Sequence, residues 1–160
     1  MSRFVAHRSE PPNANRCERF LSRSPQATRA YARRLAERAR SGTVFALCGD
    51  LGSGKTCFAQ GMALALGVEQ PVTSPTFSLV REYAGTHGQF IHGDLYRLRE
   101  AADDDTLDWD AYLEPKGLAA FEWADRSPDL FPPDTVWVRL ETLDHPSVRR
   151  IRVGNKRVAF

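Results

Sequence analysis

The sequence predicts an α/β fold that contains a buried parallel sheet, and three observations lead to this class. Residues 43–48, TVFALC, form an uninterrupted, partly β-branched apolar run, which is typical of a strand buried on both faces. Residues 49–56, GDLGSGKT, match the phosphate-loop pattern G-x-x-x-x-G-K-S/T. Residues 55–67, KTCFAQGMALALG, then carry apolar side chains at helical spacing. A buried strand, a glycine-rich loop and a helix in this order are the structural context that the pattern requires.

The composition of the 160 residues is that of one globular domain. An apolar share of 42% and a charged share of 26% are ordinary, and a formal charge of +2 is too small to indicate nucleic-acid binding by itself. Residues 1–15 are rich in Pro, Asn and Arg, so we expect a disordered N-terminal extension followed by a single domain over residues 16–160. Residues 148–157 gather five basic side chains. A solvated face is the simpler interpretation of this segment, and a nucleic-acid contact is the alternative.

The cysteine pattern indicates a reducing compartment. Cys17, Cys48 and Cys57 form no CxxC pair, and one of them stays unpaired in any disulfide scheme. Reduced thiols are typical of cytosolic proteins. No apolar run approaches the ~20 residues that a membrane span needs. We therefore expect a cytoplasmic protein with neither a membrane nor DNA as its partner.

A short strand and two helices are expected around the phosphate loop. Residues 17–22 read as a short strand. The helix that follows is expected to begin with Ser24 as N-cap and Pro25 at its first position, and to end at Gly42. Its apolar stripe consists of Thr28, Tyr31, Ala32, Leu35 and Ala39. The helix after the loop is expected to bury Phe58, Met62 and Leu66 and to end at Gly67.

The C-terminal half predicts further strands with short connections. The expected strands are residues 77–83, 89–98, 117–123, 135–141 and 148–153, with 157–160 as an edge strand. The turn-like segment AGTHG joins the first two, and the acidic segment 100–114 is expected to hold one or two short helices. The Pro-rich segment 128–133 is interpreted as a loop inside the domain, not as a domain boundary.

The phosphate loop supplies three kinds of anion contact. Its glycines let the backbone curl so that several N–H groups face inward, and the following helix adds the positive end of its dipole. Lys55 is expected to reach the β- and γ-phosphates, and the Thr56 hydroxyl can ligate Mg²⁺. A magnesium-dependent site also needs an acid at the end of a neighbouring strand. The two candidates are Asp94 and Glu122.

Missing signals restrict the class of nucleotide-binding protein. The chain lacks the D-x-x-G and N-K-x-D signatures of a GTP switch and the Ser-Gly-Gly signature of a transporter ATPase. The segment VREYAGTHG is too short for the arginine-bearing lid of a small-molecule kinase. Elimination therefore favours ATP over GTP and hydrolysis over transfer. An independent small-molecule kinase stays open as the alternative.

Four motifs in register resemble the TsaE (YjeE) family. They are GDLGSGKT (49–56), VTSPTFSLVREY (72–83), IHGDLYRL (91–98) and FEW (121–123). The resemblance implies a P-loop NTPase-type three-layer sandwich with a central, mostly parallel sheet and added antiparallel strands. It also implies a Mg²⁺-dependent ATPase, weak alone and stimulated by partners, that drives or resets the TsaD and TsaB proteins in the formation of threonylcarbamoyladenosine in tRNA. Contact with tRNA inside that complex is compatible with the resemblance.

The resemblance also implies a role for individual residues. The catalytic set is Lys55, Thr76, which would sense the γ-phosphate or its metal, and Glu122, which would orient the attacking water. The metal set is Thr56, Asp94 and Glu122. The nucleotide-binding set is Gly49, Asp50, Leu51, Gly52, Ser53, Gly54, Lys55, Thr56 and Cys57, with Trp123 nearby and Thr28 close to adenine. The sequence departs from the family pattern at Cys57, where a second Thr is usual, at Gly93, where a bulky apolar residue is usual, and at Asp108, where Gly is usual.

Overall fold

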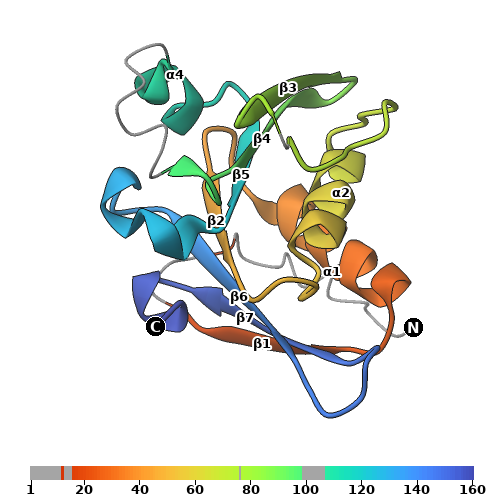
Figure 1. The fold of residues 1–160 in the computed structure, drawn as a ribbon. Coiled ribbons are helices and arrows are strands. Elements are labelled where there is room, and N and C mark those ends of the chain that lie inside the picture. The colour runs from red at the N-terminus through yellow and green to blue at the C-terminus, as the bar shows by residue number, and fades with distance from the viewer. Residues whose placement is uncertain (1–11, 13–15, 76, 99–106) are drawn as a thin grey trace, which may run out of the picture.

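The computed structural model describes residues 12, 16–75, 77–98 and 107–160 (Figure 1). The predicted disordered extension over residues 1–15 lies outside the described residues except for Pro12, so it stays a prediction. The described part has the α/β architecture that the sequence predicts.

A seven-stranded sheet forms the centre of the fold, in the order β1-β7-β6-β2-β5-β4-β3. The strands are β1 (Glu18–Ser22), β2 (Val44–Cys48), β3 (Val80–Gly85), β4 (Gly88–Asp94), β5 (Leu118–Glu122), β6 (Val136–Thr142) and β7 (Arg149–Gly154). The four central strands, β6, β2, β5 and β4, are parallel to one another. Antiparallel strands extend both edges, with β3 on β4 at one side and β7 and β1 beyond β6 at the other.

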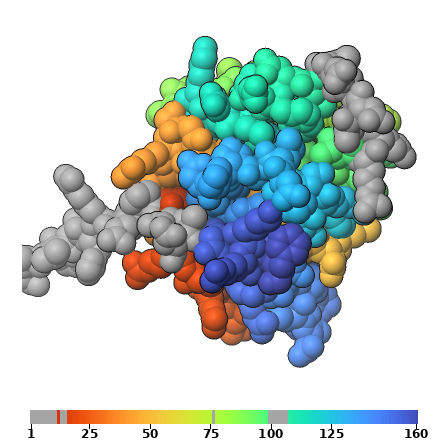
Figure 2. All heavy atoms as spheres, turned by 90° about the vertical axis from the view of Figure 1, so that its left-hand side faces the viewer, coloured from red at the N-terminus to blue at the C-terminus, as the bar shows by residue number. Residues whose placement is uncertain are grey.

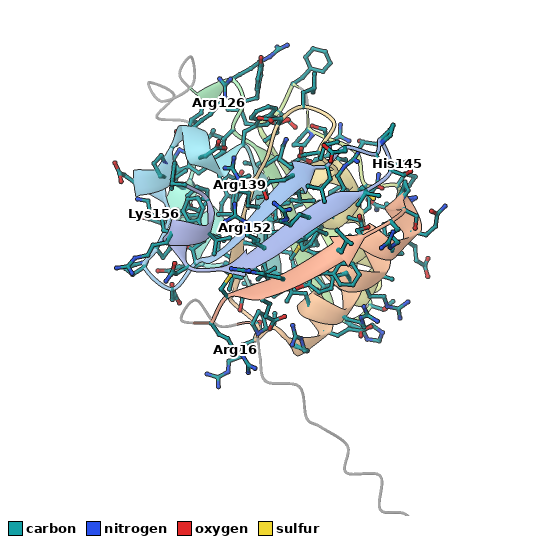
Figure 3. The ribbon with its side chains drawn as sticks, turned by 90° about the horizontal axis from the view of Figure 1, so that it is seen from below. Arg16, Arg126, Arg139, His145, Arg152 and Lys156 are labelled. Carbon is teal, nitrogen blue, oxygen red and sulfur yellow. The ribbon has the colours of Figure 1, made fainter. Side chains whose placement is uncertain are left out.

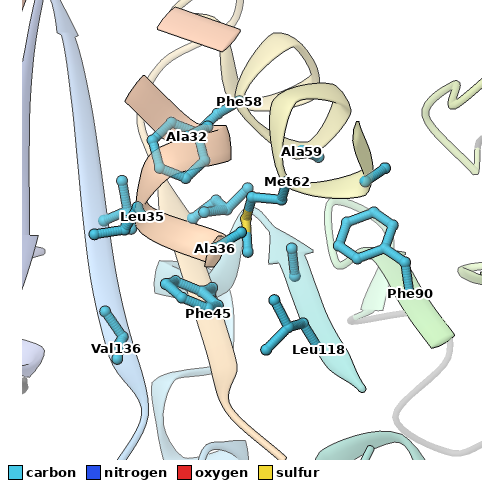
Figure 4. Packing of buried hydrophobic residues seen from close by; sticks show 14 of the residues in the cluster. Ala32, Leu35, Ala36, Phe45, Phe58, Ala59, Met62, Phe90, Leu118 and Val136 are labelled. Carbon is cyan, nitrogen blue, oxygen red and sulfur yellow. The ribbon is translucent and has the colours of Figure 1, made fainter. Parts of the chain in front are cut away.

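Helices on both faces complete three layers. Helices α1 (Pro25–Arg38) and α2 (Lys55–Ala65) lie side by side on one face of the sheet (Figure 1). Phe45 of β2 packs there with Phe58 and Met62 of α2, and all three are fully buried (Figure 4). The other face is covered by α4 (Trp109–Leu113) and by three short 3-10 helices, η1 (Ala124–Arg126), η2 (Pro128–Leu130) and η3 (Lys156–Val158). Figure 2 shows these C-terminal pieces side by side on the outside of the molecule.

Local capping chemistry fixes the helix boundaries around the loop. The Ser24 side chain accepts a hydrogen bond from the Ala27 backbone N–H at 3.0 Å, as expected of an N-cap. Helix α1 ends at Arg38, because Ala39 adopts an extended conformation three residues ahead of the predicted stop at Gly42. Helix α2 ends at Ala65, and Gly67 follows it in the left-handed region with φ of 71°.

Three of the predicted strands are absent or differ from the structure by more than one residue. Strand β3 begins at Val80, not at residue 77, because Leu79 has a positive φ of 57° that interrupts the extended backbone. Strand β4 ends at Asp94 and residues 95–98 are not extended. Residues 157–160 form no edge strand, because the Asn155 side chain accepts from the Arg157 N–H at 3.0 Å and caps η3.

The structure gives a reason for two departures from the family pattern. Asp108 replaces the usual Gly and is the N-cap of α4, with its side chain accepting from the Ala111 N–H at 3.1 Å. Gly93 lies beneath the Phe121 ring on the adjacent strand. A Cβ at Gly93 would be 2.3 Å from Cδ1 of Phe121, so this packing requires a glycine.

Candidate functional site

The glycine-rich loop between β2 and α2 has a backbone that only glycine adopts readily. Gly49, Gly52 and Gly54 all have positive φ angles, of 150°, 77° and 102°. A Cβ at Gly49 would lie 2.4 Å from the Leu140 carbonyl oxygen and 2.5 Å from Ser53 Oγ. The Ser53 hydroxyl is buried, and no described group bonds to it. A close-packed glycine loop at a helix N-terminus, with a spare donor, fits an anion such as a phosphate.

Lys55 is the first residue of α2 and its ammonium group lies inside the curl of the loop. Nζ donates to the carbonyl oxygens of Gly49 at 2.6 Å and Asp50 at 3.0 Å, and it lies 3.9 Å from the centre of the Trp123 ring. Burial lowers the pKa of Lys55, while nearby carboxylates, that of Glu122 first, oppose the shift. The structure thus holds a desolvated cation where the sequence predicts the phosphate-binding lysine.

Thr56 and Glu122 are in direct contact. The Thr56 hydroxyl donates to Oε1 of Glu122 at 2.7 Å, and Glu122 is buried at the end of β5. Asp94 ends β4 and is the register partner of Glu122. Its own oxygens accept from the Ser74 hydroxyl at 2.8 Å and from the Tyr96 N–H at 2.9 Å. One hydroxyl and two carboxylates are hard oxygen donors, which are the ligands that Mg²⁺ prefers.

These groups line one cavity of about 570 Å³. Its wall is built from residues of the loop, of the segment before β3 and of the ends of β4 and β5, including Lys55, Thr56, Ser74, Asp94, Glu122 and Trp123. A second cavity of about 400 Å³ lies beside the same loop and is lined by Thr28, Cys57 and Arg149 among others. Gly52 and Gly54 line both cavities, so the loop separates them.

The predicted site residues are therefore largely brought together. Thr76 lies outside the described residues, so its predicted role is not tested. Leu51 is at the tip of the loop with its side chain 90% exposed. Trp123 is not simply core, because it has an unusual φ of 57°, lines the larger cavity and contacts the Lys55 ammonium.

Two residues of the site were not found from the sequence. Arg149, on β7, donates from Nε to the Ser53 carbonyl at 3.1 Å and from Nη2 to the Gly52 carbonyl at 3.0 Å. No spacing rule marks a contact across so many residues. His92 contacts Glu122 at 2.9 Å, and it precedes Asp94 by two positions, so both lie on one face of β4. That period of two is a signal that could have found His92.

The fold and the loop together define a P-loop NTPase-like α/β protein. The chain belongs to the TsaE family, because the family's sequence profile, described as threonylcarbamoyl adenosine biosynthesis protein TsaE, matches residues 22–151. It is similar to the tRNA threonylcarbamoyladenosine biosynthesis protein TsaE of Bacillus subtilis, with 33% identity over 83% of this chain and 84% of the relative. The TsaE of Aquifex aeolicus is 35% identical over 83% of this chain and 92% of the relative. The crystal structure of YdiB from Bacillus subtilis superposes on this chain with a TM-score of 0.75 at 27% identity, and the match covers 90% of this chain and 89% of YdiB.

None of the helices in the described ranges is both long enough and apolar enough to cross a bilayer.

Proposed function

We propose that this chain binds ATP with Mg²⁺ and hydrolyses it, and that it acts as the accessory ATPase of TsaD and TsaB in the formation of threonylcarbamoyladenosine in tRNA. The observation that carries the proposal is the convergence of Lys55, Thr56, Asp94 and Glu122 on one cavity beside the glycine loop. A lysine, a hydroxyl and two acids around such a loop are the set that phosphoryl chemistry needs. Membership of the TsaE family supports the biological role.

Each residue has a distinct part in this proposal. The loop N–H groups and the Lys55 ammonium would bind the phosphates, and the residues that would hold Mg²⁺ are Thr56, Glu122 and Asp94. When bound, Mg²⁺ supplies neutralisation of the phosphate charge. Glu122 also has a second oxygen with which to orient a water molecule. Trp123 would lie beside the phosphates, because its ring already contacts Lys55.

The second cavity supports a place for the nucleoside. It lies on the other side of the loop from the acids, and its lining residues include Pro25 and Thr28. A flat, partly apolar base suits such a wall. We therefore retain the predicted position of Thr28 near adenine as part of the proposal.

The test is an ATPase assay with purified chain, alone and with TsaD and TsaB. We expect weak turnover alone and a marked increase when both partners are added. The Lys55→Ala variant, assayed in parallel, shows that the activity belongs to this chain. If saturating partners leave the rate unchanged, the accessory role is wrong. Phosphate transfer to an added metabolite without partners would favour the alternative, a small-molecule kinase.

A cytoplasmic location belongs to the same proposal. Cys17, Cys48 and Cys57 are all free thiols in the structure, which agrees with a reducing compartment.

Direct contact with tRNA is a separate proposal, favoured by a row of arginines. Arg19, Arg152 and Arg139 are directly opposite one another across β1, β7 and β6, and Figure 3 labels the last two on these strands. Like charges at opposite positions destabilise a sheet. Glu141 accepts from Arg152 at 3.1 Å and from Arg139 at 3.4 Å, and Arg19 has no ion-pair partner among the described residues. A row with excess positive charge suits the RNA backbone.

Salt dependence tests this contact. Labelled tRNA is titrated with the wild type and with a variant that combines Arg19→Gln and Arg152→Gln, from the row, with Arg150→Gln, an exposed arginine of β7 that lies 3.8 Å from Glu141. We expect the negative slope of log affinity against log salt concentration to become shallower by roughly 2 to 3, at about 0.7 to 0.9 for each lost phosphate contact. The control combines Arg33→Gln and Arg34→Gln on α1. Equal slopes for the two variants would mean that the arginine row is only a solvated face.

A further inference from the structure

His92 is a fully buried polar residue beneath the acids of the site. It lies on β4 with Phe90 and Asp94 on the same face of the strand, and its ring centre is 6.1 Å from that of Phe90. Its single polar contact among the described residues is from Nε2 to Oε1 of Glu122, at 2.9 Å.

The chemistry of the contact fixes which ring nitrogen donates the hydrogen bond. A carboxylate only accepts hydrogen bonds, so Nε2 must carry the proton and donate it. The other ring nitrogen, Nδ1, is buried and has no partner among the groups that the structure describes. Most buried polar atoms in native proteins are paired. His92 leaves Nδ1 unpaired while Nε2 contacts Glu122, so the contact with Glu122 is the polar interaction that orients the ring.

The same carboxylate oxygen receives two donors. Oε1 of Glu122 accepts from both His92 Nε2 and the Thr56 hydroxyl. No described group donates to Oε2. The carboxylate is therefore held at one oxygen by the imidazole and the hydroxyl, while the other oxygen is left for a ligand in the cavity that Glu122 lines.

We propose that His92 is a positioning residue for Glu122, an inference that rests on the proposed ATPase function. The Nε2–H donor selects one orientation of the carboxylate. It keeps Oε2 available to a water molecule or to the cation, and it prevents the side chain from turning both oxygens toward Thr56. His92 itself touches neither nucleotide nor metal. Such supporting contacts are what hold a reactive group in its productive geometry.

Two variants separate positioning from simple packing. His92→Leu removes the donor, and His92→Gln keeps an N–H donor on a flexible side chain. We expect His92→Leu to lower kcat for partner-stimulated ATP hydrolysis by about 10- to 100-fold, with nucleotide affinity changed by less than about threefold. We expect His92→Gln to restore most of kcat. Equal losses of kcat in the two variants, in step with their melting temperatures, would overturn the proposal.

A double variant tests whether His92 acts through Glu122. If it does, combining His92→Leu with Glu122→Gln is no slower than Glu122→Gln alone, because residues that act as a unit are non-additive. Fully multiplied losses would overturn the proposal.

A readout without nucleotide is available from ¹⁵N NMR of the histidine rings in the wild type. The proposal requires a ring that carries a proton on Nε2, assigned by the signals that disappear in His92→Gln. A ring protonated only at Nδ1 would overturn it. This measurement also distinguishes the role of His92 from the proposed ATPase function. An inactive wild type with partners would refute the ATPase function, while the NMR result would still test the hydrogen bond from His92 to Glu122.

Discussion

Replacement of Arg149 by methionine tests whether a distant strand organises the phosphate loop. Arg149 is on the helix-facing side of β7, and its guanidinium donates to the carbonyls of Ser53 at 3.1 Å and Gly52 at 3.0 Å. These two bonds tie the middle of the loop to the sheet. Methionine retains most of the apolar stem of the side chain and loses both donors.

The expected size of the effect follows from the two tethered residues. Fixing the backbone of one residue costs about 1 to 2 kcal/mol, so two released residues would cost about 2 kcal/mol or more on binding. That energy corresponds to about 30-fold in Kd. Within the loop, Ser53 N–H still donates to the Asp50 carbonyl at 3.0 Å, which limits the released freedom. We therefore expect ADP to bind about 5- to 30-fold more weakly.

Calorimetric titration with ADP and Mg²⁺ measures this change. The matched control is Arg150→Met, the next residue along β7, which is exposed and lies 3.8 Å from Glu141, away from the loop. We expect its Kd to match that of the wild type. If the two variants bind ADP equally while thermal melting shows both folded, Arg149 does not organise the loop and the reasoning is refuted.

Three further predictions concern single side chains. Lys55→Ala should abolish or severely weaken ATP binding, and an unchanged affinity by calorimetry would contradict the assigned role of the loop. Glu122→Gln should retain ATP binding but slow hydrolysis in single-turnover assays; loss of binding instead would make Glu122 chiefly a metal or structural residue. Burial raises the pKa of the Cys48 thiol to about 12 from 9.0, so the folded state keeps a proton that the unfolded chain releases. The free energy of unfolding should therefore fall as the pH rises above 9.0, by up to about 1.4 kcal/mol per pH unit, and urea denaturation should give a flatter pH profile for Cys48→Ala.

The parts of this fold that could be predicted from the sequence depend on local rules. Residues 44–48 of the apolar run are buried throughout because both faces of β2 are covered, and a continuous apolar run is typical of a strand in that position. Ser24 caps α1 because a short hydroxyl side chain reaches the N–H three residues ahead. The phosphate loop is likewise a local pattern of glycines, lysine and threonine.

The parts that could not be predicted depend on contacts between distant residues. Arg149 donates to the carbonyl of Gly52, which is 97 positions earlier in the sequence. The sequence around an arginine on a strand does not indicate such a distant partner. Polar and apolar side chains do not alternate regularly over residues 156–160. The 3-10 helix η3 forms there with Val158 and Ala159 buried against the rest of the fold, which is a tertiary contact and not a local pattern. The expected strand at 77–83 begins with the apolar residue Phe77, yet Phe77 is 95% exposed, so its apolar character placed the predicted start of β3 too early.

The order of the strands shows which of the two candidate acids lies closer to the phosphate loop, a question that the sequence left open. Strand β5 lies between β2 and β4, so Glu122 is one strand from the phosphate-loop strand and Asp94 is two strands away. Neighbouring strands are about 4.8 Å apart, so the backbone at Asp94 is about 10 Å from the level of β2. Glu122 accordingly touches Thr56, whereas Asp94 is held by Ser74 and Tyr96. A cation bound to the Thr56 hydroxyl would therefore have Glu122 within direct reach, and we expect Asp94 to act on it through a water molecule.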